Sequence, residues 1–124
     1  MILVDTSVWI DHLRSGNATL VGLLEQNRVV MHPLILGELA CGNLKNRDQL
    51  IQLWQNLDSL SVINHKEALF FIKQNGLMGK GVGYIDVHLL ASVILDANSQ
   101  LWTLDKHLAK VASELGCAMK MGDG

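Results

Sequence analysis

The chain has 124 residues, close to the commonest size of a single domain, so one domain covering residues 1–124 is expected. Hydrophobic residues make up 49% of the chain and charged residues 18%, a composition that excludes intrinsic disorder. Ten basic and twelve acidic residues give a net charge of −2, so any contact with nucleic acid must be local.

The sequence gives no indication of a membrane segment or a secretory signal. No apolar run approaches the roughly 18 residues that a membrane span needs, and the N-terminal MILVDTS lacks a basic region. Cys41 and Cys117 lie in apolar surroundings without the spacing of metal ligands, which favours reduced core thiols over a disulfide. We therefore expect a cytoplasmic protein.

Short runs rich in aliphatic residues alternate with helical patterns along the chain. Strands are predicted at residues 2–4, 28–31, 61–63, 101–104 and 117–121. Thr6 or Ser7 can begin the first helix, and Pro33 suits the first turn of the third. Gly116 can end the last helix. This alternation predicts an α/β protein with a central, mainly parallel sheet.

Apolar residues recur at helical spacing in several segments. The three clearest sets are Leu50, Ile51, Trp54 and Leu57; Val87, Leu90, Ala91 and Ile94; and Leu108, Val111, Ala112 and Leu115. Trp54, Phe70 and Phe71 lie in such stripes and are interpreted as core residues rather than base-stacking groups. On the last helix, Lys110 and Glu114 are spaced to form a same-face pair worth a few tenths of a kcal/mol.

Four of the twelve acidic residues stand in unusual surroundings. Asp5 follows the strand ILV and Asp105 follows LWTL, so both lie at the carboxyl ends of predicted parallel strands, where open α/β sheets bind ligands. Glu38 falls in the middle of a helix, on a face that its apolar neighbours predict to be buried. Asp86 begins a helix beside its apolar stripe.

For each acid alone, a structural role is the simpler interpretation. Asp86 and Asp105 are suited to cap helices, and Asp5 can accept a hydrogen bond in a local turn. Capping does not explain Glu38, and no Arg or Lys lies within a helical turn of Glu38 or Asp86 to neutralise a buried carboxylate. The four acids therefore indicate a bound cation. Oxygen donors, with no His or Cys at zinc-site spacing, favour Mg²⁺ or Mn²⁺.

Such an ion commonly completes its coordination shell with water and substrate phosphate. An acidic cluster at a sheet edge therefore suggests phosphodiester chemistry, in which the metal lowers the pKa of a water and stabilises the leaving oxygen. The five histidines are scattered singly along the chain, so each is expected in a surface or capping role rather than as a general base.

The segments VDTSVWIDHL, PLILGELACG, GYIDVHLLAS and LWTLDKHLAKVA resemble, in order and spacing, a family of PIN-domain ribonucleases, specifically the toxins of VapBC-type toxin–antitoxin pairs. The resemblance covers nearly the whole chain and implies a three-layer α/β/α PIN fold. It also implies an RNA substrate, a cognate antitoxin whose C-terminal segment occupies the active-site groove and, as in many members, a homodimer.

Carried over residue by residue, the metal-binding and catalytic acids of the family fall on Asp5, Glu38, Asp86 and Asp105. The small hydroxyl residue that follows the first Asp in the family is matched by Thr6 or Ser7. Thr103 holds the hydroxyl position ahead of the last Asp. The resemblance therefore implies a complete set of four acids with supporting hydroxyl groups.

Residues 76–83, GLMGKGVG, contain four glycines and lead directly toward Asp86. They match neither a Walker loop nor a dinucleotide fingerprint, since no strand precedes them. One interpretation is a flexible loop; the other is that its backbone N–H groups and Lys80 contact an RNA phosphate. Lys106 and Arg14 are similar candidates, with solvated surface charge as the alternative.

The predicted function is that of a metal-dependent endoribonuclease acting as the toxin of a toxin–antitoxin pair. The alternative is a catalytically inert PIN-like module that binds RNA or a partner without cleavage, and the complete set of four acids argues against it. A phospho-acceptor domain is a third hypothesis. It would need an acidic pair and a Lys near the first strand, which the isolated Asp5 does not offer, and it gives Glu38 no role.

Overall fold

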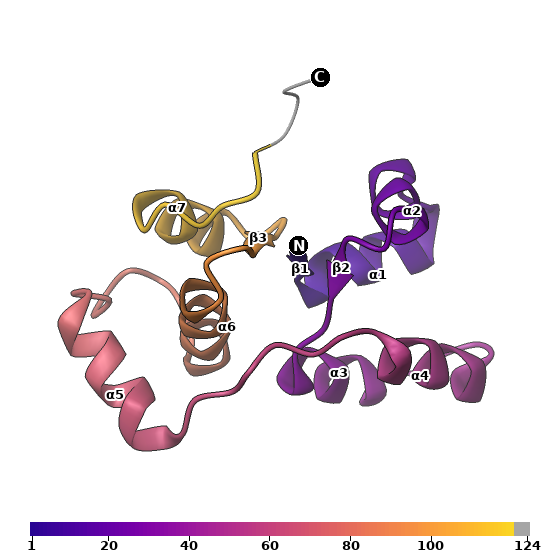
Figure 1. Cartoon of the computed structure of the whole chain (residues 1–124). Helices are drawn as coiled ribbons and strands as arrows, with labels where there is room; N and C mark the ends of the chain where they lie inside the picture. The colour runs from indigo at the N-terminus through magenta and orange to yellow at the C-terminus, as the bar shows by residue number, and fades with distance from the viewer. Residues whose placement is uncertain (121–124) are drawn as a thin grey trace.

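The computed structural model describes residues 1–120, which form seven helices and three strands (Figure 1). In chain order these are β1 (Ile2–Val4), α1 (Thr6–Ser15), α2 (Ala18–Glu25), β2 (Val29–Val30), α3 (Pro33–Ala40), α4 (Arg47–Asn56), α5 (His65–Gln74), α6 (Tyr84–Leu95), β3 (Gln100–Trp102) and α7 (Lys106–Glu114). None of these helices has the length and apolar composition of a membrane span.

The three strands form one parallel sheet in the order β2-β1-β3. In the centre, Ile2 pairs with Val29 on one side and Gln100 on the other, and Val4 pairs with Trp102. Apart from Gln100, every strand residue is buried, as expected for a parallel sheet that helices cover on both faces. The predicted α/β class with a parallel sheet is confirmed.

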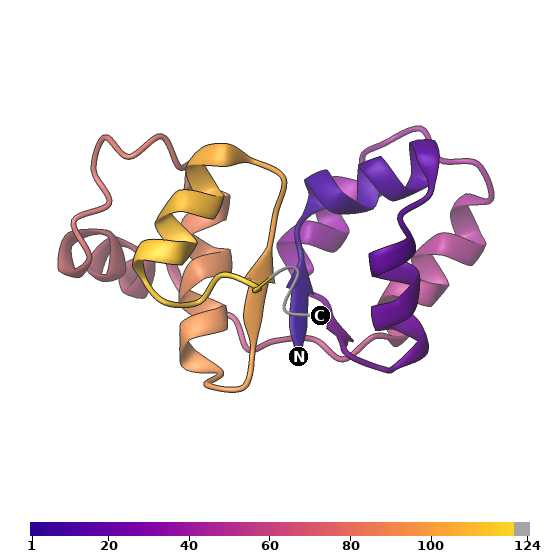
Figure 2. The same cartoon turned by 90° about the horizontal axis from the view of Figure 1, so that it is seen from above.

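Helices cover the sheet in two layers. Figure 1 shows α1, α2 and α7 on one face of the sheet and α3, α4, α5 and α6 on the other, which makes the three-layer α/β/α arrangement. In Figure 2 the strands run along the middle of the molecule, with α5, α6 and α7 on the β3 side and α1 to α4 on the β2 side. Because the strands are parallel, the chain leaves β1 and β3 at the same edge of the sheet, where α1 and α7 begin.

The predicted helix boundaries agree with the structure. α1 begins at Thr6, α3 begins with Pro33 in its first turn, and α7 is followed by Gly116 with a positive φ of 76°. The positions of Pro33 and Gly116 have local chemical causes. Proline lacks the N–H that the first turn of a helix leaves unbonded, and glycine readily adopts the left-handed backbone at a helix end.

Two of the predicted strands are wrong. Near residues 61–63 there is a single bridge, between Met31 and Ser59, and near residues 117–121 a single bridge between Leu101 and Ala118. Residue 121 lies outside the described residues. The edge strands β2 and β3 have two and three residues, so little backbone is available for a further strand to pair with. The adjoining segments add isolated backbone hydrogen bonds instead of a ladder.

The surroundings of individual side chains correct three further predictions. Trp54 and Phe71 belong to the core, but Phe70 is 65% exposed, because adjacent helical positions point about 100° apart and α5 is covered on one side only. Cys117 is buried as expected, and burial raises the pKa of its thiol, whereas Cys41 is exposed. Glu114 pairs at 3.6 Å with Lys80, and not with Lys110 as predicted.

Candidate active site

The carboxylate of Asp5 is held at the edge of the sheet where β1 and β3 end. Its Oδ2 accepts hydrogen bonds from Ser7 Oγ and Thr103 Oγ1, each at 2.8 Å. The backbone N–H of Asp5 donates to the carbonyl of Trp102 at 2.9 Å, which extends the contact between the two strands. Asp5 is buried, so these two hydroxyl groups replace water as its hydrogen-bond donors.

Both hydroxyl groups also fix the loop that follows β3. Each hydroxyl has a single proton and gives it to Asp5, so the 3.3 Å contact between Ser7 Oγ and Thr103 Oγ1 contains no hydrogen bond. Their free lone pairs accept instead: Leu104 N–H donates to Ser7 Oγ and Asp105 N–H donates to Thr103 Oγ1, both at 3.0 Å. The start of α1 and the start of α7 are thereby tied together.

Asp105 caps α7. Its Oδ1 accepts a hydrogen bond at 2.9 Å from the N–H of Leu108, three residues on. The capping interpretation of Asp105 is therefore correct, and it is compatible with a second role because the cap uses only one of the two carboxylate oxygens.

Glu38 lies on α3 and is exposed, so the prediction of a buried face around it is wrong. The buried side of α3 carries Ile35 and Leu39, and Glu38 lies beside that side rather than on it. Its Oε1 accepts a hydrogen bond from Thr6 Oγ1 at 2.8 Å. This contact joins α3 to the first residue of α1, so the structure brings Glu38 to the same edge of the sheet as Asp5.

Asp86 occupies the third position of α6 and is half-buried. It is not the N-cap: Gly83 holds that position, and its N–H donates to Asp86 Oδ2 at 3.1 Å. Burial raises the pKa of Asp86, the Gly83 N–H lowers it, and the negative charges of the three other acids, Asp5, Asp105 and Glu38, raise it further. Asp86 is therefore near enough to each of the other three acids to be affected by its charge.

The four acids share one arrangement. Asp5, Glu38, Asp86 and Asp105 each have one carboxylate oxygen that accepts a hydrogen bond from a hydroxyl or backbone N–H group. Within residues 1–120, no hydrogen bond of the protein reaches the other oxygen of any of the four. Each carboxylate is thus oriented by the protein and has one oxygen left for a ligand.

Among residues 1–120, no basic side chain forms an ion pair with any of the four acids. The ion pair in this part of the chain joins Lys80 to Glu114. Nor do three His, Cys, Asp or Glu side chains among residues 1–120 lie close enough together to hold one ion directly. The donors nevertheless fit Mg²⁺ or Mn²⁺, because Mg²⁺ takes oxygen ligands, commonly one or two carboxylates, and keeps several waters. At most two of the acids would then contact one ion directly.

A cluster of polar residues on and beside α6, exposed at His65 and Tyr84 and buried at His32, His88 and Ser92, was not predicted from the sequence. Tyr84, His88 and Ser92 lie at i, i+4 and i+8 on this helix, and the Tyr84 and His88 rings pack edge-on at 4.6 Å. The Tyr84 hydroxyl is 2.6 Å from His65 Nδ1, and Ser92 Oγ is 3.1 Å from His32 Nε2. The periodic spacing on α6 was the signal that could have revealed this cluster.

Two of these histidines are buried; His88 departs from the expected surface or capping role, whereas His32 fulfils the capping alternative. His32 is fully buried, and burial lowers its pKa to about 4, while burial also lowers the pKa of His88. His32 does cap α3, as the capping interpretation allowed: its Nδ1 accepts the N–H of Leu34 at 3.1 Å. Both rings are therefore neutral near pH 7.

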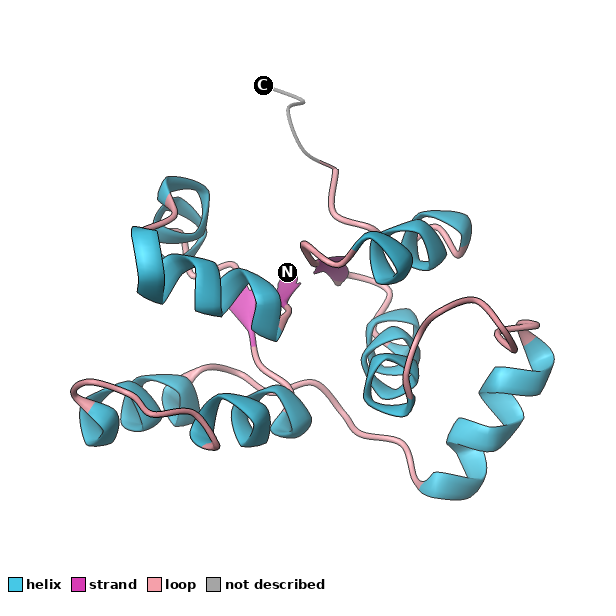
Figure 3. Ribbon diagram, turned by 180° about the vertical axis from the view of Figure 1, so that it is seen from behind, coloured by secondary structure: helices cyan, strands magenta, loops and turns pink. Residues whose placement is uncertain are grey.

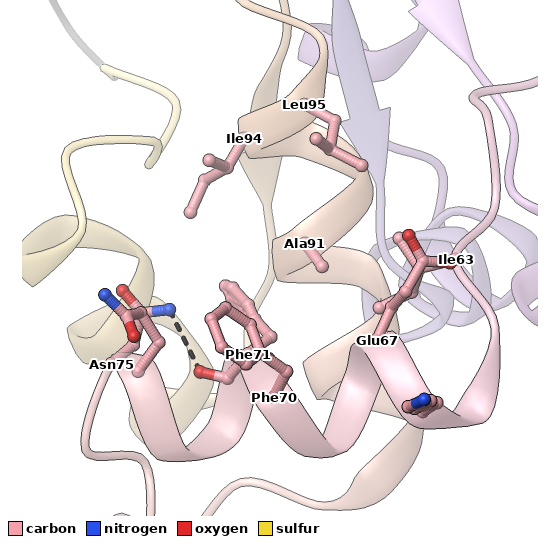
Figure 4. A pocket seen from close by; sticks show the side chains of 10 residues that line it. Ile63, Glu67, Phe70, Phe71, Asn75, Ala91, Ile94 and Leu95 are labelled. Atoms are coloured by element: carbon pink, nitrogen blue, oxygen red, sulfur yellow. Dashed lines mark hydrogen bonds between the residues drawn. The ribbon is translucent and has the colours of Figure 1, made fainter.

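An apolar groove of about 460 Å³ lies between α5 and α6, away from the four acids (Figure 4). Phe70, Phe71, Ala91, Ile94 and Leu95 are among the residues that line it. None of the four acids does, so this groove is not the candidate active site.

Residues 2–114, which include all four acids and their hydroxyl partners, match the PIN domain family. The chain is also similar to two curated proteins named Ribonuclease VapC32, from the CDC 1551/Oshkosh and H37Rv strains of Mycobacterium tuberculosis. Each is 45% identical over 119 residues, which make up 96% of this chain and 96% of the relative. Both the family match and this likeness extend over nearly the whole chain, so the chain belongs to the PIN domain family.

Proposed function

We propose that this chain is a metal-dependent endoribonuclease that acts in the cytoplasm as the toxin of a toxin–antitoxin pair. One observation carries the proposal: four carboxylates lie near the edge of the sheet where β1 and β3 end, each with one oxygen held by the protein and the other free. The ribonuclease name of its relatives supports RNA as the substrate.

In this proposal Asp5, Glu38, Asp86 and Asp105 hold Mg²⁺ or Mn²⁺ with their free oxygens, directly or through water. A divalent ion supplies an activated water and neutralises charge on the leaving oxygen. The protein's own contribution is orientation. Ser7 and Thr103 fix the carboxylate of Asp5, and Thr6 does the same for Glu38. The Gly83 N–H fixes Asp86.

The reaction is hydrolysis with water as the nucleophile. The water oxygen bonds to phosphorus in line with the departing 3′ oxygen, the P–O3′ bond breaks, and the 3′ oxygen takes up a proton. The products are a 5′-phosphate and a 3′-hydroxyl. The 2′-hydroxyl takes no part in this step, so a preference for RNA comes from binding, for which single-stranded segments with exposed bases are the expected target.

An end-group analysis of cleaved RNA tests this proposal. Cleavage should be endonucleolytic, stop with EDTA, return with Mg²⁺ or Mn²⁺, and persist where the substrate carries a single 2′-deoxy nucleotide at the cut site. Asp86→Asn, which keeps an oxygen for the Gly83 N–H, serves as the inactive control. Cyclic-phosphate ends or chelator-resistant cleavage would contradict the mechanism, and RNA binding without cleavage would favour the inert module.

The proposed partners are a cognate antitoxin and a second copy of this chain. Several large apolar side chains are exposed, among them Leu95 at 67%, Phe70 at 65% and Val62 at 57%. Leu95 and Phe70 both line the apolar groove, and a continuous exposed apolar patch is typical of a protein–protein interface. Sedimentation should show a dimer at tens of micromolar protein and a heavier complex on addition of the antitoxin. A monomer under both conditions would remove both partners.

A further inference from the structure

The loop that connects α5 to α6 contains the glycine-rich segment 76–83, called here the glycine loop (Figure 3). It packs along α7: Leu77 and Lys80 line a small cavity of about 30 Å³ together with Val111 and other residues of α7. Lys80 Nζ lies 3.6 Å from Glu114, in the last turn of that helix. The loop is thus attached to the helix that begins after Asp105.

Gly81 lies close against the first turn of α7. A Cβ atom at this position would lie 2.7 Å from Cδ2 and 2.9 Å from Cγ of His107, distances that side-chain atoms do not adopt. Rotation of the ring could move Cδ2 and Cγ away, but the Cβ of His107, fixed to the helix, would still lie 3.3 Å from the added atom, so the loop or the helix would have to shift by a few tenths of an ångström. Gly81 also has a φ of +80°, which residues other than glycine rarely adopt.

This contact lies between two of the four acids. The glycine loop ends at Gly83, whose N–H holds Asp86 Oδ2, so a displaced loop would carry that donor with it. On the other side, His107 lies two residues beyond Asp105, in the first turn of α7. The distance between Gly81 and His107 therefore couples the start of α6 to the start of α7.

We propose that Gly81 is a positioning residue for the candidate active site: its contact with His107, possible only without a side chain, sets the separation of Asp86 and Asp105. The role of these two acids in metal binding rests on the proposed function. The pairing of Lys80 with Glu114 supports a docked loop, because it attaches the preceding residue of the loop to the same helix.

Gly79 provides a matched control for Gly81. It lies in the same loop with a φ of +72°, but a Cβ atom there would have no heavy atom within 4 Å. Gly79→Ala and Gly81→Ala therefore introduce similar backbone strain, and only Gly81→Ala adds the collision with His107. Mn²⁺ affinity, measured by calorimetry without substrate, should be close to wild type in Gly79→Ala and about tenfold weaker in Gly81→Ala, as for other groups that orient metal ligands.

A compensating change tests the contact itself. His107→Ala removes the ring with which the methyl group added by Gly81→Ala would collide. The double variant Gly81→Ala, His107→Ala should therefore bind Mn²⁺ with an affinity within about threefold of that of His107→Ala alone. The effects of the two substitutions are then non-additive, as expected for residues in contact. RNA cleavage should follow the same order through kcat rather than KM. Thermal unfolding of each variant shows whether it is folded. If Gly81→Ala does not fold, His107→Ala alone should still lower Mn²⁺ affinity a few-fold, because the loop loses its support.

Two outcomes would overturn the inference. Equal Mn²⁺ affinities in Gly79→Ala and Gly81→Ala, or an unchanged affinity in His107→Ala together with no recovery in the double variant, would mean that the contact does not position the acids. If the wild-type chain neither binds Mn²⁺ nor cleaves RNA, the proposed function fails as well. If EDTA abolishes cleavage by the wild-type chain but Gly79→Ala and Gly81→Ala have the same Mn²⁺ affinity, only the role of Gly81 is rejected and the proposed function stands.

Discussion

Asp105 combines two tasks in one side chain, and its two oxygens separate them. Oδ1 caps α7 through the Leu108 N–H, while the other oxygen is free for a ligand. Asp105→Ala should therefore lower the free energy of unfolding by about 1 kcal/mol and abolish cleavage. Asp105→Asn retains the cap and loses the charge, so it should be inactive but nearly as stable as wild type. Chemical denaturation and an RNA cleavage assay check both; an active Asp105→Ala protein would show that the residue is only a cap.

Asp86 is held in a strained electrostatic environment. Burial raises the pKa of Asp86, the hydrogen bond from the Gly83 N–H lowers it, and the charges of the other three acids raise it. The ionised form of Asp86 therefore costs stability at neutral pH. Asp86→Asn removes that charge and should unfold at the same or a higher temperature than wild type in EDTA while losing cleavage. The substitution should lower stability if Asp86 serves only the fold.

At the scale of elements, His32 links the helix that carries Glu38 to the helix that carries Asp86. Its Nδ1 accepts the Leu34 N–H at the start of α3, so the ring proton lies on Nε2, which donates to Ser92 on α6. Protonation of Nδ1 would break the first of these bonds. Burial, with a smaller effect of His88, lowers the pKa of His32 to about 4, so the ring is neutral at the pH at which it makes these two bonds.

This linkage predicts acid sensitivity. Between pH 6.5 and about 4 the unfolded chain binds a proton at His32 that the folded chain does not, so stability is full above this range and falls by up to about 3 kcal/mol as the pH drops through it. His32→Asn keeps an acceptor for the Leu34 N–H but does not titrate. Denaturation at several pH values should show a shallower loss in this variant, whereas parallel curves would refute the role of His32.

Local chemistry explains which elements were predictable. Thr6, Pro33 and Gly116 mark helix ends because their effects act within one turn. The predicted strand at residues 61–63 failed because an aliphatic run forms a strand only if a neighbouring edge offers enough backbone, and β2 has two residues. Phe70 was placed in the core because apolar periodicity shows which residues share a face but not how far neighbouring elements cover it.

At the scale of the whole molecule, the repulsion among the four acids should appear as metal-dependent stability. An ion at about ten times its dissociation constant adds roughly 1.4 kcal/mol, which raises the melting temperature by a few degrees. Millimolar Mg²⁺ or Mn²⁺ should therefore stabilise wild type and leave the Asp5→Asn, Asp86→Asn double variant unchanged. Equal shifts of the two proteins in a thermal melt would disprove the metal site.

The sequence could single out four acids as a candidate site because strand ends and apolar flanks are local patterns, although the buried face expected around Glu38 was wrong. The assignment of these acids to metal binding stays a prediction. The contacts that orient these acids were harder to predict from the sequence. The partner of Asp5 at Thr103 is 98 positions away, and the cluster of His65, Tyr84 and His88 depends on the packing of α5 against α6. Such contacts follow from tertiary structure, which single-sequence patterns do not specify.

The donors that orient Asp5 come from opposite ends of the chain, with Ser7 and Thr103 separated by 96 positions. A ribosome-bound chain that has not yet released β3 therefore has neither the second hydroxyl nor Asp105, and its first strand lacks a neighbour on one side. The candidate site can be completed only after Thr103 and Asp105 have been synthesised and β3 has paired with β1. If the proposed function holds, a nascent chain that lacks these residues cannot yet cleave the message from which it is being translated.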